Sequence, residues 1–158
     1  MSFKRTAETL KEGAHTLERD YYVNPKILLK EYDNIFLNNW ICAGRSSELS
    51  KNGDYKTVNI GTESAIILRD STGNLKAHAN VCRHRGTRIC EKLSGQFSNS
   101  IQCGYHGWTY NLNGDLIGAP HMDTVDDFNK KDFPLHSISI AEWEGFIYIN
   151  IKHNPKKF

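Results

Sequence analysis

Two short stretches of the chain bring together cysteine and histidine, side chains that often bind transition metals. In "ANVCRHRGTRIC", residues 79–90, Cys82 and His84 stand two positions apart. In "QCGYHGW", residues 102–108, Cys103 and His106 stand three positions apart. Each stretch supplies one thiol and one imidazole, so the sequence predicts a metal centre to which both contribute.

The spacing of these side chains distinguishes two kinds of centre. Two thiolates and two imidazoles can hold a tetrahedral zinc ion, or a [2Fe-2S] cluster in which two histidines replace two cysteines on one iron. Zinc fingers usually take both cysteines from one knuckle and both histidines from another, whereas here each stretch supplies one of each. The pattern therefore favours the diiron cluster. A zinc-stabilised binding module without a redox role is the alternative.

Residues beside the four candidate ligands fit a cluster. Gly86, Gly104 and Gly107 let the backbone approach closely and direct N–H groups inward, where sulfides need hydrogen bonds. Trp108 can cover the centre.

Basic residues are concentrated locally and not over the whole chain. The formal net charge is +2, too near neutral to suggest a nucleic-acid partner. Arg83, Arg85 and Arg88 surround the first stretch, where a solvated loop with ion pairs is the simpler interpretation. The alternative is a docking edge for an acidic electron donor.

Length and composition are those of one soluble domain. The 158 residues are 39% apolar and 24% charged, with no secretory signal and no run long enough to span a membrane. We therefore expect a cytoplasmic protein without a membrane partner, whose four cysteines are thiols or metal ligands and not disulfides.

The other cysteines and one histidine are assigned structural positions. Cys42 and Cys90 are expected to be small buried hydrophobic residues. His78 alternates with Lys76 and Asn80, so it is expected on an exposed strand face.

The elements that position the two stretches are one helix and a series of short strands. Asn24 can cap a helix that starts at Pro25 and ends near Asn39. From Trp40 onward, alternating apolar residues and turn signals predict antiparallel strands over 54–60, 64–68, 75–81, 108–112, 136–143 and 145–151. Asn113-Gly114 suits a tight hairpin. The fold class is mainly β, and both cysteine and histidine stretches fall at strand ends.

"CRHRG" followed by "CGYHGW" resembles the signature of the Rieske domain at the N-terminus of the large subunit of ring-hydroxylating and related non-haem iron oxygenases. "YYVNPKILLKEYDNIFLNNW", "NGDYKTVNIG", "GTRICE" and "YNLNGDLIGAP" also resemble segments of that family, so the likeness covers roughly residues 20–151. It implies a Rieske-type iron–sulfur protein fold of small antiparallel sheets. Residues 1–39 would form a lead-in and a helix packing on the domain, and residues 40–158 the Rieske domain.

The resemblance also implies a role for each matched residue. Cys82 and Cys103 would bind one iron of the [2Fe-2S] cluster, and His84 and His106 the other. The family's supporting positions fall on Arg85, Gly86, Tyr105, Gly107 and Trp108.

In this family a reductase or ferredoxin passes electrons to the Rieske cluster, which passes them to a mononuclear non-haem Fe(II) that activates O2. The chain ends at "IKHNPKKF", close to where the family's catalytic domain begins. The second iron is therefore expected in a missing domain, in cis, or in a partner chain, and no catalytic residue is assigned here. The resemblance is compatible with a homo-oligomer, and it leaves the organic substrate open. A stand-alone Rieske ferredoxin is the alternative, although such ferredoxins lack the N-terminal segment with its helix.

Overall fold

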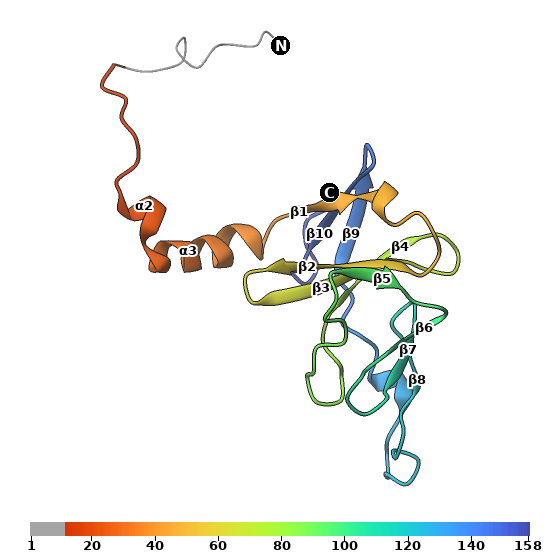
Figure 1. Ribbon diagram of the computed structural model, residues 1–158. Helices are drawn as coiled ribbons and strands as arrows, with labels where there is room; N and C mark the ends of the chain where they lie inside the picture. The colour runs from red at the N-terminus through yellow and green to blue at the C-terminus, as the bar shows by residue number, and fades with distance from the viewer. Residues whose placement is uncertain (1–11) are drawn as a thin grey trace.

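The computed structural model describes residues 12–158 as a helical arm followed by three small antiparallel sheets (Figure 1). The strand orders are β1-β10-β9, β4-β3-β2-β5 and β6-β7-β8. The strands are β1 Ile41–Arg45, β2 Asp54–Ile60, β3 Glu63–Arg69, β4 Leu75–Ala79, β5 Ser94–Gln96, β6 Ser100–Gln102, β7 Thr109–Asn111, β8 Leu116–Gly118, β9 Ser139–Trp143 and β10 Phe146–Asn150. Short 3-10 helices lie at η2 Ser46–Glu48 and η3 Lys130–Asp132. The predicted mainly β fold is confirmed.

The sheet containing β3 contributes to two hydrophobic cores. Successive side chains of a strand point to opposite faces, and both faces of β3 are buried. Ala65 and Ile67 face the core shared with β1 and β10, whereas Ile66 and Leu68 face the core shared with the β6-β7-β8 sheet. The second core also contains Cys82 and Cys103, so the predicted metal site is anchored in packed apolar side chains.

Two hairpins follow the predicted turns with one difference. Between β9 and β10, Glu144 and Gly145 have φ of 50° and 76°, as a type I′ turn requires at both central residues. Between β7 and β8, only Gly114 has a positive φ, of 92°. The side chain of Asn111 instead accepts bonds from the N–H groups of Asn113 and Asp115, which makes a longer loop than the predicted tight turn.

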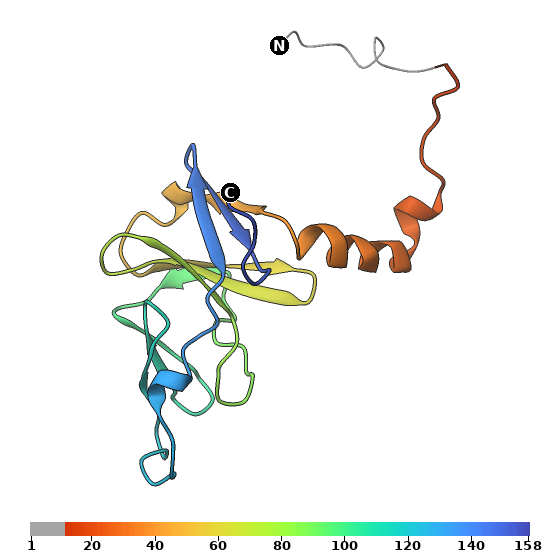
Figure 2. The ribbon, with the colours of Figure 1, turned by 180° about the vertical axis from the view of Figure 1, so that it is seen from behind.

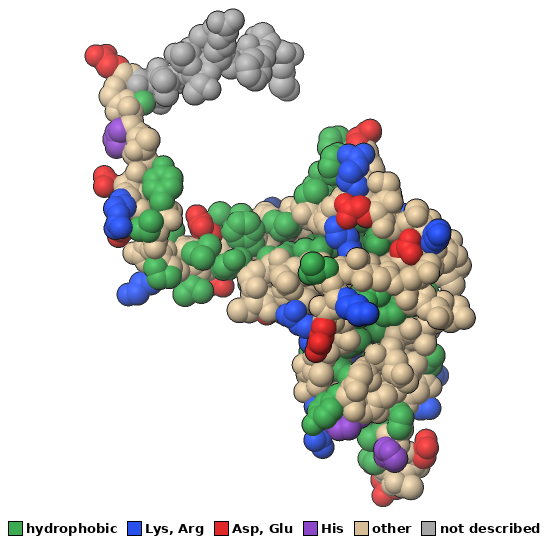
Figure 3. All heavy atoms as spheres, in the orientation of Figure 1, with side chains coloured by type: hydrophobic (Ala, Val, Ile, Leu, Met, Phe, Trp, Pro, Cys, Tyr) green, Lys and Arg blue, Asp and Glu red, His purple; other side chains and the backbone are tan. Residues whose placement is uncertain are grey.

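The N-terminal arm comprises α2 Asp20–Val23, α3 Pro25–Glu31 and the π-helix η1 Tyr32–Phe36. Asn24 caps α3 as predicted, because its side chain accepts a bond from the N–H of Lys26 at 3.0 Å. Both ribbon views show the arm extending away from the sheets (Figures 1 and 2). Hydrophobic side chains lie along its surface (Figure 3), and those exposed are Tyr21, Tyr22, Val23, Leu28, Leu29 and Ile35. Within residues 12–158 no helix is long and apolar enough to cross a membrane.

Two burial predictions are wrong. Cys42 is exposed, because it lies on the outer face of the edge strand β1. His78 is only 2% exposed. The loop between β7 and β8 covers its face of β4, since the imidazole Nε2 lies 3.2 Å from the carbonyl oxygen of Leu112 and the ring packs against Gly114. Alternation identifies a strand face but does not reveal what covers it.

The burial of His78 predicts a stability that depends on pH. Burial lowers its pKa below about 6.5, the bond to Leu112 and the charge of Asp115 oppose this, and Lys76 adds to it. The unfolded chain therefore binds more protons below about pH 6.5, so stability is complete above that pH and is lost as the pH falls. Between about pH 7.5 and pH 5.5 we expect a loss of about 1 kcal/mol from this residue, or roughly 2–4 °C in thermal midpoint.

Thermal midpoints of two variants at both pH values test this expectation. His78→Gln removes the titrating group, so its thermal midpoint should fall less between the two pH values. His15→Gln, at an exposed position, should show the same fall in thermal midpoint as the parent. An unchanged shift in His78→Gln would contradict the assignment.

Candidate metal centre

The four predicted ligands lie in two loops that follow the same backbone path. In the first loop, residues 80–90, the N–H of Gly86 donates to the carbonyl of Cys82 at 3.0 Å, and the N–H of Cys82 donates to Thr87 at 2.8 Å. In the second loop, residues 102–109, Gly107 donates to Cys103 at 3.1 Å, and Cys103 donates to Trp108 at 2.8 Å. Each loop thus carries its cysteine at the start and a glycine four residues later.

Glycine is required at the closing position of both loops. Gly86 and Gly107 each have a φ of 72°, in the left-handed region that L side chains rarely adopt. Gly104 does not have a positive φ, and a Cβ added there would meet no atom within 4 Å, so its predicted role in close backbone approach stays a prediction. The two glycines at the matching positions therefore shape the loops.

The two predicted thiol ligands are buried beside each other. Cys82 and Cys103 are each 3% exposed. Burial raises the pKa of the Cys82 thiol, and the adjacent Cys103 thiol raises it further. The Tyr110 hydroxyl, 3.3 Å from Cys82 Sγ, and the N–H of His84 oppose this rise because both favour the thiolate.

The two predicted imidazole ligands also form a pair. The rings of His84 and His106 lie 4.8 Å apart between centroids, at an angle of 70°. Both side chains are half-buried, so this part of the site is nearer to solvent than the thiols. Burial lowers the pKa of His84, with contributions from His106 and Arg85. Neutral imidazole is the form of histidine that binds a metal.

Aromatic side chains fix the orientation of the imidazoles. The buried Trp108 stacks on His84 with centroids 4.8 Å apart and planes at 10°. Phe128 and Phe133, in the segment between β8 and β9, pack against the indole with ring centroids 5.8 and 5.7 Å away. The exposed Tyr105 lies 3.8 Å from the ring of His106. Trp108 thus contacts one of the two imidazoles directly, and its covering role stays a prediction.

The donor set and the unpaired nitrogen atoms fit a [2Fe-2S] cluster. The site consists of a thiol pair and an imidazole pair. Two ligands of one kind on each iron is the arrangement of a Rieske cluster. Trp108 Nε1, on the ring that stacks on His84, and Arg83 Nε are buried without a hydrogen-bond partner in the described chain. Buried N–H groups normally have a partner, and sulfides are acceptors.

The arginines of the first loop differ in their surroundings. The Nη1 of Arg83 lies 2.6 Å from the Nε2 of His136, so this side chain is held against the segment before β9. Arg85 and Arg88 are exposed. The basic cluster predicted from the sequence therefore consists of one anchored and two free guanidinium groups.

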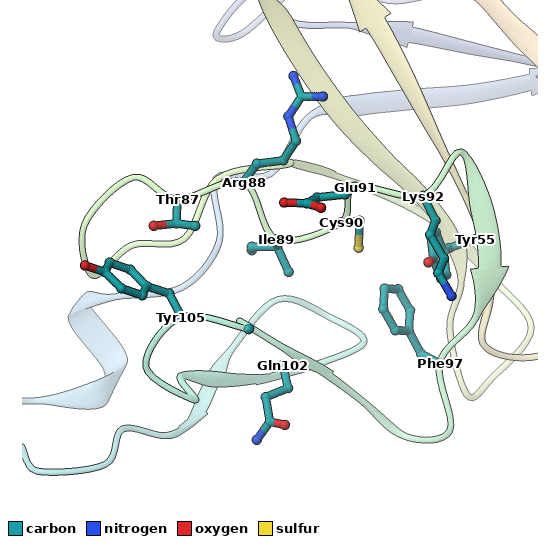
Figure 4. Close-up of a pocket in the computed structure, with 11 residues that line it drawn as sticks. Tyr55, Thr87, Arg88, Ile89, Cys90, Glu91, Lys92, Phe97, Gln102 and Tyr105 are labelled. Atoms are coloured by element: carbon teal, nitrogen blue, oxygen red, sulfur yellow. The ribbon is translucent and has the colours of Figure 1, made fainter.

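A cleft of about 630 Å³ separates the outgoing part of the first loop from β6 and the second loop (Figure 4). Its lining includes Tyr55 and Phe97, whose rings stack with centroids 4.3 Å apart near the Lys92 end (Figure 4). Lys92 and Tyr105 lie at its opposite ends (Figure 4). Cys90 also lines the cleft, and burial raises the pKa of its thiol to about 11, which confirms its predicted role as a buried residue.

Two residues at the site were not predicted. Tyr110 reaches Cys82 from β7, and Asn80 binds the end of the first loop through its side chain. The sequence signal for Tyr110 was its alternation with Trp108, which predicted burial but not its partner. Asn80 had been placed with His78 on a polar face, and it is instead buried.

Comparison with known proteins identifies relatives for most of the chain. A family model described as the Rieske [2Fe-2S] domain matches residues 39–129. The glycine betaine monooxygenase oxygenase subunit of Chromohalobacter salexigens is 34% identical over 152 residues, covering 95% of this chain and 34% of that protein. The carnitine monooxygenase oxygenase subunit of Acinetobacter baumannii is 36% identical over 141 residues, covering 89% of this chain and 38% of that protein. The chain thus spans little more than a third of the length of these relatives.

Solved structures give the same result. A structure of a quaternary ammonium Rieske monooxygenase, described as revealing carnitine oxidation by gut microbiota and inter-subunit electron transfer, superposes with a TM-score of 0.82 at 34% identity. It is matched over 87% of this chain and 38% of its own. Naphthalene 1,2-dioxygenase from Rhodococcus sp. gives a TM-score of 0.80 at 30% identity, over 86% of this chain and 31% of its own. These findings confirm the resemblance inferred from the two cysteine and histidine stretches.

Proposed function

The chain belongs to the Rieske [2Fe-2S] domain family, and we propose on this premise that it is the electron-carrying part of an oxygenase. A Rieske domain binds a [2Fe-2S] cluster, which supplies one-electron transfer when bound. Electrons would arrive from a reductase or ferredoxin and pass to a mononuclear non-haem iron in another domain or chain. The observation that carries the proposal is the pair of loops with one backbone path, each presenting a cysteine and a histidine.

We propose that the thiols and imidazoles of these loops are the cluster ligands, namely Cys82, Cys103, His84 and His106. The buried thiols would hold one iron away from water, and the half-buried imidazoles would hold the other near the surface. Trp108 would keep the His84 ring in place, and Tyr110 would donate a hydrogen bond to the Cys82 sulfur. Hydrogen bonds to the sulfurs are one of the factors that set the reduction potential of such a site.

Reconstitution with iron and sulfide, followed by redox titration, tests this proposal. We expect a coloured protein with acid-labile sulfide and a midpoint potential in the range of about −150 to +300 mV. His84 and His106, each bound through one ring nitrogen, would keep the other free to carry a proton, so reduction should favour protonation. The midpoint should therefore fall at alkaline pH by up to about 59 mV per pH unit for one proton.

Three outcomes would count against the proposal. A colourless protein holding one metal atom per chain would establish the zinc alternative. A midpoint that does not change with pH across the alkaline range would count against histidine ligation. Turnover of an organic substrate by this chain without a catalytic partner would contradict the purely electron-carrying role.

We further propose that the electron donor is acidic and docks beside the cleft. Arg85, Arg88 and Lys92 are exposed and flank the two loops, which supports a cationic docking edge. With an acidic plant-type ferredoxin as the probe, reduction should slow as salt rises from about 0.05 to 0.5 M. Arg88→Glu should slow it about tenfold at low salt. Lys157→Glu makes the same charge change at an exposed position in the C-terminal segment and should leave the rate unchanged. Equal rates for Arg88→Glu and the parent would refute the docking edge.

We propose a quaternary ammonium compound as the substrate of the complete system. This is supported by the 34% and 36% identity to glycine betaine and carnitine monooxygenase subunits, against 29% to the alpha subunit of chlorobenzene dioxygenase from Cupriavidus. A homo-oligomer is supported by the inter-subunit electron transfer described for the related monooxygenase. The free cysteines Cys42 and Cys90 support a cytoplasmic location.

A further inference from the structure

The two loops share their internal backbone bonds, but the segments that flank them are held in different ways. The second loop is held by its own hairpin, because β6 and β7 pair directly up to Gln102 and Thr109. The first loop lies between β4 and β5, which pair with β3 and β2 and not with each other. In this described part of the chain, no backbone hydrogen bond joins residues 79–81 to residues 88–91.

The side chain of Asn80 takes the place of the missing strand pairing. Its Oδ1 accepts from the N–H of Ile89 at 3.1 Å and from the N–H of Cys90 at 2.8 Å. Its Nδ2 donates to the carbonyl of Cys90 at 2.7 Å and to the hydroxyl of Ser64 at 3.2 Å. An amide has two acceptor sites and two donors, so the whole capacity of this side chain is used.

The burial of Asn80 keeps water from replacing these bonds. The residue is 4% exposed, and its own N–H donates to the carbonyl of Ser64 on β3 at 2.8 Å. Water therefore has little access to replace the four bonds when they are lost. Since Cys82 is two residues away, the amide fixes the start of the loop to its end and both to β3.

We propose that Asn80 is a positioning residue for the metal site, closing the first loop so that Cys82 and His84 stand opposite the pair on the second loop. This inference rests on the proposed ligand assignment. Asn80 does not touch the ligands; it acts through the backbone of residues 81–90. Groups that orient metal ligands typically change metal retention by about 10–100-fold when removed.

The test compares Asn80→Ala with two control variants. Asn150→Ala removes another amide that is 2% exposed and accepts a bond from the N–H of Lys152, but that lies in β10, a strand whose Ile147 and Ile149 belong to the other core. Ser64→Ala removes only one of the four partners of Asn80 and leaves the loop end bound. The readouts are the half-life of the cluster under chelator, its electron paramagnetic resonance spectrum, and hydrogen exchange of the Ile89 and Cys90 amides.

For Asn80→Ala we expect a cluster half-life about 10–100-fold shorter, a broadened spectrum and faster exchange at Ile89 and Cys90. Asn150→Ala and Ser64→Ala should stay within about twofold of the parent in cluster half-life. Asn80→Asp has the same shape as the parent side chain, keeps the acceptor and loses the donors. Its cluster half-life should lie between those of the parent and of Asn80→Ala. A parent-like half-life in Asn80→Ala, or an equal loss in Asn150→Ala, would overturn the proposal.

Failure of this inference can be distinguished from failure of the proposed function. If the parent chain itself holds no cluster, the proposed function fails. Exchange in the metal-free chain still decides whether Asn80 closes the loop: Asn80→Ala should then speed exchange in residues 82–90 and leave residues 103–108 unchanged. If Asn80→Ala changed hydrogen exchange equally in both loops, the inference would be overturned.

Discussion

Cys82→Ser is expected to yield a folded chain that does not retain iron and acid-labile sulfide. The thiol is buried beside Cys103, and serine offers an oxygen that binds iron poorly in place of a thiolate. Removing a group that only orients a ligand costs about 10–100-fold in metal affinity, so removing a ligand should cost more than about 100-fold. Iron and sulfide analysis of protein reconstituted in parallel with the parent measures the loss.

Cys90→Ser is the matched control. Cys90 is also a buried cysteine of the same core, eight residues along the chain, and its raised pKa of about 11 keeps it as a protonated thiol. This variant should retain iron and sulfide at the level of the parent. If Cys82→Ser bound as much iron and sulfide as the parent, the ligand assignment would be wrong.

A second large effect is expected from His84→Cys, which should keep a cluster but lower its midpoint potential by roughly 100 mV or more. The imidazole is neutral when bound and a thiolate is charged, so the substitution adds one negative charge and stabilises the oxidised state. All-cysteine plant-type clusters lie near about −400 mV, well below the Rieske range. Redox titration followed by visible absorption measures the shift.

The pH dependence provides an independent readout of the same variant. With one imidazole fewer at the site, the midpoint should fall less steeply at alkaline pH than in the parent. His153→Cys introduces the same thiol at an exposed position in the C-terminal segment, and its midpoint should match that of the parent. A parent-like midpoint in His84→Cys would show that His84 does not bind the metal.

Local sequence patterns predicted most of the strands. Strand β2 coincides with the predicted range 54–60, and the last two strands meet at Glu144-Gly145 as expected. Such features depend on neighbours in the chain: alternation sets the strand faces, and residues that tolerate positive φ set the turns. The two cysteine and histidine stretches were likewise readable, because ligand type and spacing are local properties.

Burial and partners required the folded chain. His78 and Asn80 lie on a polar face by alternation, yet other segments cover both: the loop after β7 covers His78, and residues 89–90 bind Asn80. Tyr110 shows the same limit, since its partner Cys82 lies 28 residues away. The period of a strand contains no information about segments that approach from elsewhere in the chain.

The amino-acid sequence by itself determined the fold class, the donor types and the two loops, because backbone preference and ligand chemistry act over a few residues. Only the tertiary structure decided that Cys82 and Cys103 are buried together while His84 and His106 face the surface. It also decided that one loop is held by its hairpin and the other by the amide of Asn80. Those outcomes depend on contacts between distant segments, which form when sheets pack around shared cores.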